Sequence, residues 1–127
     1  MHKSKLAGFI IDCDTPDLDA AAKFWSQALG YSIKPQSTEA GAEVYRNLDS
    51  SAAGMHVEVQ QVKHPSRVHL DIEADDIEAE VARLEKLGAK RIQNVRTWVV
   101  MEAPTGQRFC VVRIQNANFD ATANRWP

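Results

Sequence analysis

The chain has 127 residues, a formal net charge of −2 and two cysteines. A chain of this length can bury a hydrophobic core as one domain, without disulfides to hold it together. Because the charges nearly balance and no run of Lys or Arg is long, the composition argues against a nucleic-acid-binding protein. We find neither a membrane-spanning apolar stretch nor a signal-peptide pattern. We therefore expect a cytoplasmic protein in which Cys13 and Cys110 are reduced thiols.

The first half of the chain predicts one helix among several strands. Thr15 and Pro16 are expected as the N-cap and the first residue of the helix, and Gly30 as its left-handed C-terminal stop. Residues 55–62 alternate between apolar and polar side chains, which is typical of a half-buried strand. In chain order, the predicted elements are a strand over 6–13, the helix up to Leu29, and strands over 31–35, 43–48 and 55–62.

The second half repeats this order after a break at His64-Pro65-Ser66. Asp75 is expected to cap its helix, with Glu78 completing a capping box. In chain order, the predicted elements are a strand over 67–73, a helix from Asp76 to Leu87-Gly88, strands over 90–95, 97–103 and 109–114, and a tail, 116–127, without a clear period.

Both predicted helices begin in a similar way, with Asp17-Leu18-Asp19-Ala20 in the first half and Asp76-Ile77-Glu78-Ala79 in the second. Both also end in Leu-Gly. A half-chain repeat of this kind predicts two βαβββ modules that share one sheet system. We place module one at about 5–63 and module two at about 66–115, both within a single domain, 1–127, that ends in the tail 116–127.

Three stretches of the chain carry a family resemblance. They are Asp14-Thr15-Pro16-Asp17 through Phe24-Trp25 to Leu29-Gly30, Arg67-Val68-His69-Leu70-Asp71 through Leu87-Gly88-Ala89, and Ala103-Pro104-Thr105-Gly106-Gln107-Arg108-Phe109-Cys110. Their order and spacing resemble the vicinal oxygen chelate superfamily of glyoxalases, bleomycin-resistance proteins and extradiol dioxygenases, and within it the small glyoxalase-like domain proteins. The resemblance implies an α+β fold of two βαβββ modules, whose curled mixed sheets surround a cavity for a small organic molecule. It also implies a homodimer.

The resemblance further implies where a metal is held, because metal-using members place one ligand on each of four strands. The corresponding positions here are Ile10, Glu58, His69 and Cys110. Isoleucine cannot bind a metal, whereas the other three residue types are zinc ligands. Alternatively, Cys110 is a small buried hydrophobe and Glu58 a solvated strand residue. We therefore expect no cofactor and no complete metal site. If a divalent metal binds, we expect Glu58, His69 and Cys110 as its ligands.

His69 and Asp71 are the first candidates for a functional pair, because alternate residues of a strand share one face, about 7 Å apart. In this interpretation His69 hydrogen-bonds a ligand or moves a proton, with Glu58 or Asp71 in support. The competing interpretation is that a backbone carbonyl holds His69 while Asp71 neutralises Arg67.

The remaining candidates lie on strands that, in the fold implied by the resemblance, surround the cavity. The candidate ligand-binding residues are Ile10, Glu58, Gln60, His69, Trp98 and Cys110. Alternation does not decide which way Trp98 points, nor which of Tyr45 and Arg46 points inward. We expect five further residues to be structural or exposed: His56 at the surface, Phe24 and Trp25 in the core, and Asp12 with Asp14 at the turn and helix start.

Two functions agree with these residues. The first is a small-molecule-binding protein without metal or chemistry, which Ile10 and Cys110 favour. The second is an enzyme of the lyase, isomerase or dehydratase type that acts on a small oxygenated substrate, with His69 as its acid–base. The usual motifs for nucleotide-cofactor chemistry, serine hydrolysis and dithiol redox are missing. A ferredoxin-like module that binds RNA or protein needs one strand fewer in each half.

Overall fold

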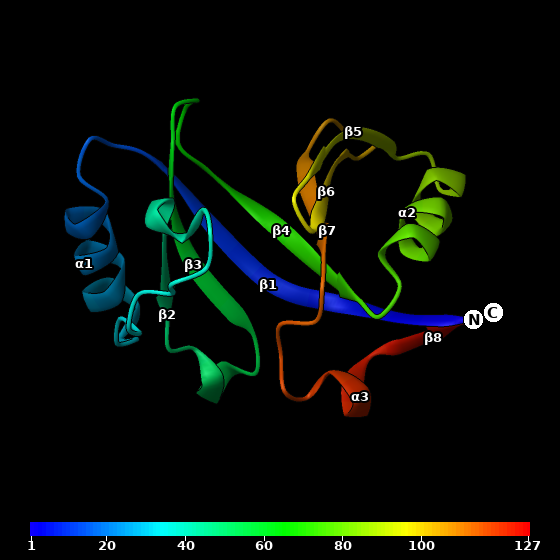
Figure 1. Ribbon diagram of the computed structural model, residues 1–127, viewed down its shortest axis with the longest axis horizontal. Helices are drawn as coiled ribbons and strands as arrows, with labels where there is room; N and C mark the ends of the chain where they lie inside the picture. The colour runs from blue at the N-terminus through cyan, green and yellow to red at the C-terminus, as the bar shows by residue number, and fades with distance from the viewer. The chain divides into compact units, whose positions relative to one another are not determined.

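The computed structural model describes residues 1–127 and contains eight strands, three α-helices and two short 3-10 helices (Figure 1). In chain order, the elements are β1 (His2–Asp14), α1 (Leu18–Leu29), η1 (Ala42–Val44), β2 (Tyr45–Leu48), η2 (Ser51–Ala53), β3 (His56–Val62), β4 (Arg67–Ala74), α2 (Ile77–Lys86), β5 (Lys90–Val95), β6 (Trp98–Glu102), β7 (Arg108–Val112), α3 (Phe119–Thr122) and β8 (Asn124–Trp126). No helix combines the length and the apolar character that a bilayer span demands.

The chain divides into two compact units. One is Phe9–Val68, and the other joins Met1–Gly8 to His69–Pro127; we call them the 9–68 unit and the 69–127 unit. The strands follow the order β2-β3-β1 in the 9–68 unit and β1-β4-β7-β6-β5 in the 69–127 unit, where β8 also pairs with β1. Because β4 and β7 are parallel whereas β2–β3, β5–β6 and β6–β7 are antiparallel, the sheet is mixed. The predicted α+β class is confirmed.

In the 9–68 unit, α1 packs on one face of the strands β2 and β3. The core of this unit is formed by apolar side chains from β1, α1, β2 and β3, namely Ile11, Leu18, Leu48, Val57 and Val59. Since successive strand residues point to opposite faces, the intervening residues of β3 face away from the helix. This alternation in β3 was predicted from the sequence.

In the 69–127 unit, α2 packs in the same way on β5, β6 and β7. Its core is built from Ala74, Val81, Leu84, Val99, Met101, Phe109 and Val111. Val81 and Leu84 belong to the apolar stripe that helical periodicity predicted for α2. The strand faces that point away from α2 are therefore free to carry other chemistry.

The two N-caps differ from the predicted ones. Asp17 caps α1 by accepting a hydrogen bond from the backbone N–H of Ala20, and Asp76 caps α2 through the N–H of Ala79. Thr15, the predicted cap, instead accepts from the N–H of Asp17. A carboxylate that directly precedes the first helical turn reaches the third N–H, and Thr15 lies too early to do so. Gly30 ends α1 with a φ of 76°, as predicted.

The second predicted cap, Asp75, has a different partner, because its carboxylate accepts from the backbone N–H of Lys3. The predicted capping box does not form either. Glu78 pairs with the guanidinium of Arg91, with Oε1 2.6 Å from Nη2. Its side chain therefore does not turn back toward the helix start.

Two segments differ from their predicted structure. Residues 31–35 form no strand, and only Ile33 makes an isolated bridge, to Leu48. The pairing cannot continue because Pro35 has no N–H to donate. The tail, in contrast, gains structure: β8 pairs with β1 in the register His2↔Trp126. A three-residue strand is too short to show a period in the sequence.

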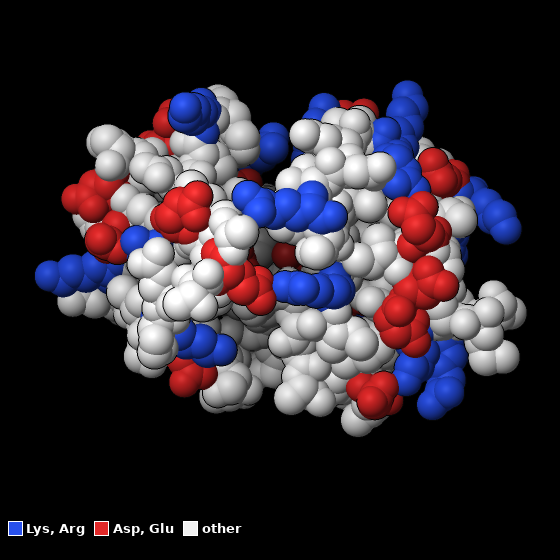
Figure 2. Space-filling model, in the orientation of Figure 1, with Lys and Arg blue, Asp and Glu red and all other residues white.

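Side chains of both charges are interspersed over the face of the molecule shown in Figure 2. Neither the basic nor the acidic side chains form one continuous patch on this face. This distribution agrees with the sequence-based argument against a phosphate-backbone partner.

Candidate functional site

The strand β4 carries the first group of candidate residues. His69 and Asp71 lie on the same face of β4, and Nε2 of His69 is 3.4 Å from Oδ1 of Asp71. Both side chains are largely buried, with exposed fractions of 13% and 7%. The structure confirms that the two residues share a face, which strand alternation predicted.

Cys110 completes a cluster of three residues with this pair. It is the register partner of Asp71 in the parallel pairing of β4 with β7. One donor atom from each of His69, Asp71 and Cys110 lies within 4.8 Å of the others. Cys110 also packs in an apolar group with Ala7 and Val112, against which Trp98 is placed. The open question about Trp98 is thereby answered, since its side chain lies on the same side of the sheet as the cluster.

The carboxylate of Asp71 is the least satisfied group of the cluster. Its Oδ1 atom is buried and makes no hydrogen bond. Burial of a carboxylate oxygen without a donor is costly, and a nearby positive charge or an added donor reduces this cost. The cluster therefore offers a ligand an acceptor in Asp71, an imidazole that can donate or accept, and a thiol.

A second polar group lies in the 9–68 unit, on the face of β3 that points away from α1. Nε2 of His56 is 2.5 Å from Oε1 of Glu58, and both side chains are largely buried. His56 was predicted at the surface, and this prediction was wrong because the imidazole pairs with the carboxylate of Glu58. Gln60 continues the row and donates to the hydroxyl of Tyr45 across the β2–β3 pair, at 3.0 Å.

The same strand pair decides between Tyr45 and Arg46. The hydroxyl of Tyr45 lies with the polar row, whereas Nε of Arg46 is 2.9 Å from Oδ1 of Asp19 on α1. Tyr45 is therefore the residue that faces away from the helix.

The remaining candidates are packing or pairing residues. Ile10 is buried, with 2% of its surface exposed. Asp12 is equally buried and lies 3.7 Å from the guanidinium of Arg67, whereas Asp14 is exposed at the end of β1. Trp25 packs against the core, as predicted, but Phe24 is 61% exposed and only touches the edge of Trp25. The prediction that Phe24 belongs to the core was wrong, because it lies on the solvent side of α1.

The residues do not fit the four-ligand metal set that the superfamily resemblance implies. Ile10 holds one of the four positions with a buried hydrocarbon side chain that has no donor atom. Glu58, at a second position, is already hydrogen-bonded to His56. What the structure does bring together is the smaller set of His69, Asp71 and Cys110, in which Asp71 takes part in place of Glu58.

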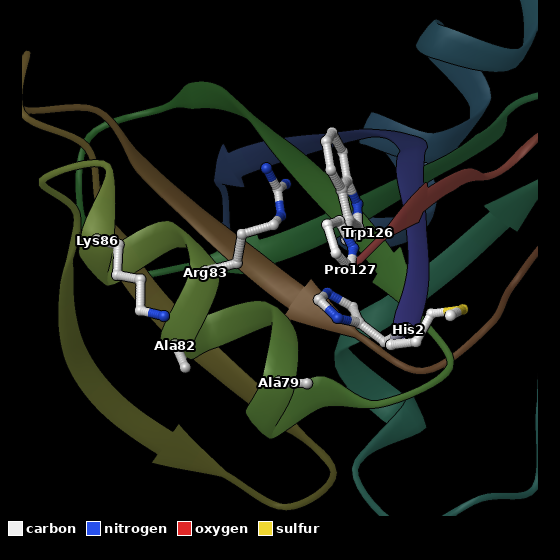
Figure 3. Close-up of a pocket in the computed structure, with 8 residues that line it drawn as sticks. His2, Ala79, Ala82, Arg83, Lys86, Trp126 and Pro127 are labelled. Atoms are coloured by element: carbon white, nitrogen blue, oxygen red, sulfur yellow. The ribbon is translucent and has the colours of Figure 1, made fainter.

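A groove of about 490 Å³ lies elsewhere in the 69–127 unit, between α2, β8 and the start of β1 (Figure 3). Arg83 of α2 extends toward Trp126 of β8, and its guanidinium lies 3.8 Å from the ring centroid. The groove is lined by Met1, His2, Ala79, Ala82, Arg83, Lys86, Trp126 and Pro127.

Two titratable side chains of this groove, His2 and Arg83, bind a buried carboxylate of the protein itself. Glu80 is fully buried and accepts from His2 at 2.7 Å and from Arg83 at 2.8 and 2.7 Å. Burial alone raises the pKa of Glu80, but the hydrogen bonds from Arg83, His2 and Ser4 outweigh burial and leave this pKa below its ordinary value. Sequence analysis missed this network, because His2 lies 78 residues from Glu80 in the chain and no local pattern predicts their contact.

Comparison with known proteins identifies a family. A family model described as a glyoxalase-like domain matches residues 9–112. The chain is similar in structure to a hypothetical protein from Bacillus halodurans, with 14% identity, a TM-score of 0.59, and coverage of 91% of this chain and 99% of that one. It is also similar to a glyoxalase/bleomycin resistance protein/dioxygenase superfamily member from Vibrio splendidus, with 17% identity, a TM-score of 0.50, and coverage of 87% and 99%. A search of curated proteins finds no match.

Proposed function

Since the chain belongs to the glyoxalase-like domain family, we propose that it binds a small oxygenated organic molecule at the polar faces of its sheet, without the superfamily's four-ligand metal. The observation that carries this proposal is the buried cluster of His69, Asp71 and Cys110, with a carboxylate oxygen that has no hydrogen-bond donor. A hydroxyl group of a ligand supplies such a donor, and the imidazole can pair with the ligand's neighbouring oxygen.

The 9–68 unit supports the same proposal. The carbonyl oxygen Oδ1 of Asn47 is buried without a hydrogen bond, and Asn47 is the cross-strand partner of Glu58. Two acceptors therefore lie side by side next to His56 on a face that no helix covers. In each unit, taken by itself, an unsatisfied acceptor favours a ligand group that donates a hydrogen bond, such as a hydroxyl.

The buried Ile10 favours binding over metal chemistry of the superfamily type. An apolar side chain at one of four ligand positions has no donor atom and removes a quarter of the coordination set.

The proposal is tested by screening small hydroxylated and carbonyl compounds for an increase in Tm, followed by calorimetric titration of each compound that raises it. We expect Asp71→Asn and His69→Gln to weaken binding of such a compound by about tenfold or more, as is usual when a buried hydrogen bond to a charged group is lost. His64→Gln is the matched control, because His64 bonds only to the adjacent Pro65 carbonyl at the surface. Equal affinity in all three variants contradicts the proposal.

A second candidate function is an enzyme of the lyase or isomerase type, with His69 as the acid–base. The contact of 3.4 Å between His69 and Asp71 favours it, because a carboxylate that orients an imidazole is a common arrangement for proton transfer. Exchange of a ligand's α-proton for deuterium, followed by NMR, separates the two functions. Exchange that is lost in His69→Gln supports the enzyme, whereas tight binding without exchange supports the binding protein.

We also propose that the protein is a cytoplasmic homodimer, as the family resemblance and the two thiols suggest. Light scattering of the purified protein tests the dimer, for which the expected mass is twice the 14.1 kDa of one chain.

A further inference from the structure

We propose that His69, Asp71 and Cys110 form a three-ligand site for one soft divalent cation, with Zn²⁺ as the best fit. The site goes beyond the proposed function, because the cation needs no organic ligand in order to bind. It also differs from the superfamily's set: its ligands come from two neighbouring strands of one unit, and Asp71 lies outside the superfamily's four positions.

The spacing of the three side chains suits a small cation. Around tetrahedral zinc, with bonds of about 2.0 to 2.3 Å, ligand atoms lie roughly 3.5 Å apart. Nε2 of His69 and Oδ1 of Asp71 already lie 3.4 Å apart. The other separations are within 4.8 Å, which small side-chain rotations can close. The backbone supports this arrangement, since Asp71 and Cys110 are register partners on hydrogen-bonded parallel strands.

The state of Asp71 is an independent observation that points to a cation. Its side chain is 7% exposed, and its Oδ1 atom has no hydrogen-bond donor. Elsewhere in the same unit, the buried carboxylates of Glu73 and Glu80 each accept at least three hydrogen bonds. A bound cation would satisfy Asp71 as these donors satisfy Glu73 and Glu80.

The donor set determines which cation fits. Thiolate and imidazole favour Zn²⁺ and related soft or borderline ions, whereas Mg²⁺ and Ca²⁺ prefer sites made of oxygen atoms alone. Three protein ligands leave a fourth position for water or for an oxygen atom of a ligand. The apolar contacts of Cys110 with Ala7 and Val112 shield the sulfur from solvent. The His56–Glu58 pair of the other unit has no thiol and only two such side chains, so it is not a competing site of this kind.

The test is a titration of the full chain, stripped with a chelator, with Zn²⁺ and separately with Co²⁺ as a spectroscopic probe. We expect one Zn²⁺ per chain by calorimetry and an increase in Tm with added zinc. We also expect Co²⁺ to give a thiolate-to-metal charge-transfer band and the visible spectrum of a tetrahedral site. Mg²⁺ should bind at least a hundredfold more weakly.

Three variants identify the ligands. Cys110→Ser should abolish the charge-transfer band, while Asp71→Asn and His69→Gln should each weaken Zn²⁺ binding by about tenfold to a hundredfold or more. Cys13→Ser is the matched control, because Cys13 is the only other cysteine and belongs to the 9–68 unit. If Cys110→Ser does not fold, Cys110→Ala gives the same comparison.

The two proposals fail separately. Zinc binding below one-tenth of an ion per chain, or a charge-transfer band that persists in Cys110→Ser and vanishes in Cys13→Ser, overturns the cation site. Binding of a hydroxylated compound by the metal-free protein tests the proposed function alone.

Discussion

Buried carboxylates lie in two regions of the 69–127 unit. In one region they accept several hydrogen bonds, and in the other a carboxylate oxygen accepts none. Glu73 lies under the turn that follows β7, where it accepts from the backbone N–H groups of Gln115 and Asn116 and from the side chain of Asn116, at 2.6 to 2.9 Å. Glu80 is satisfied to the same degree by His2 and Arg83. The Oδ1 atom of Asp71, in contrast, makes no hydrogen bond, and Nε2 of His69 lies 3.4 Å from it. A fully satisfied carboxylate stabilises a fold, whereas an unsatisfied one is available to a ligand.

The largest effect is expected from Glu73→Ala. This change leaves two backbone N–H groups and the amide of Asn116 without their acceptor, next to the buried ammonium of Lys5. We expect a loss of about 3 kcal/mol in the free energy of unfolding, measured with urea. Asp120→Ala, in the tail that Glu73 binds, is the control, since the exposed carboxylate of Asp120 pairs with Lys3. A loss in Glu73→Ala no larger than in this control contradicts the assignment of Glu73 as a structural clamp.

A smaller effect is expected from Glu80→Gln, because the amide keeps the shape of the side chain but loses its charge. We expect a loss of about 2 kcal/mol at neutral pH, with Glu85→Gln on the exposed face of the same helix as the control. The folded-state pKa of Glu80 lies below its ordinary 4.5, so its contribution is complete above the unfolded pKa and is lost as the pH falls through the folded one.

The pH dependence is therefore a second measurement on the same pair of proteins. The difference in stability between the wild type and Glu80→Gln should be constant near pH 7 and should shrink as the pH falls below the ordinary pKa of 4.5. A difference that grows in acid contradicts the assigned role of Glu80 as a charged acceptor.

Ile10→Val should lower the free energy of unfolding by less than these two changes. This variant also tests whether Ile10 contributes to packing alone or to zinc binding as well. Ile10 is 2% exposed, so the loss of one methylene group should cost about 1 kcal/mol. Zinc affinity should not change, because Ile10 has no donor atom and lies outside the proposed three-ligand set. A tenfold change in zinc affinity would show that this position contributes to the site after all.

The repeated halves explain why Ile10 and His69 are informative. Each lies two residues before a buried aspartate on the strand that leads into a helix, with Asp12 in the first half and Asp71 in the second. Asp12 lies 3.7 Å from Arg67, whereas Asp71 lies beside an imidazole and a thiol. The halves thus share a buried acid, but only the second half places an imidazole and a thiol next to it.

Local patterns in the sequence were sufficient for much of this description. Alternation placed His69 and Asp71 on one face of a strand, because that property depends on two residues of one element. The same logic located both helices, although the caps at Asp17 and Asp76 lie one or two residues from the predicted ones. Periodicity and capping act over a few residues, and a single sequence contains them in full.

These local patterns do not predict contacts between elements that lie far apart in the chain. Cys110 lies opposite Asp71 because β4 pairs with β7 in one particular register, which side-chain packing sets and no local motif encodes. The ligand set that the family resemblance implied for a metal accordingly contained Glu58 beside His69 and Cys110, and not Asp71. The position of the tail was missed for the same reason, since its contact depends on a hydrogen bond from Trp126 to Ser4.

The smallest effect on stability, and the sharpest contrast, is expected from Asp71→Asn. The carboxylate gains no hydrogen bond through Oδ1 in the wild type, so replacing it with a neutral amide should change the free energy of unfolding by less than about 1 kcal/mol, measured in metal-free buffer with urea. Zinc and hydroxylated ligands should nevertheless bind far more weakly. Glu73→Gln, only two residues along the same strand, should show the reverse: lower stability with unchanged zinc affinity. If Asp71→Asn is instead as destabilising as Glu73→Gln, then Asp71 is a structural acid like its neighbour, and its unsatisfied oxygen has no functional meaning.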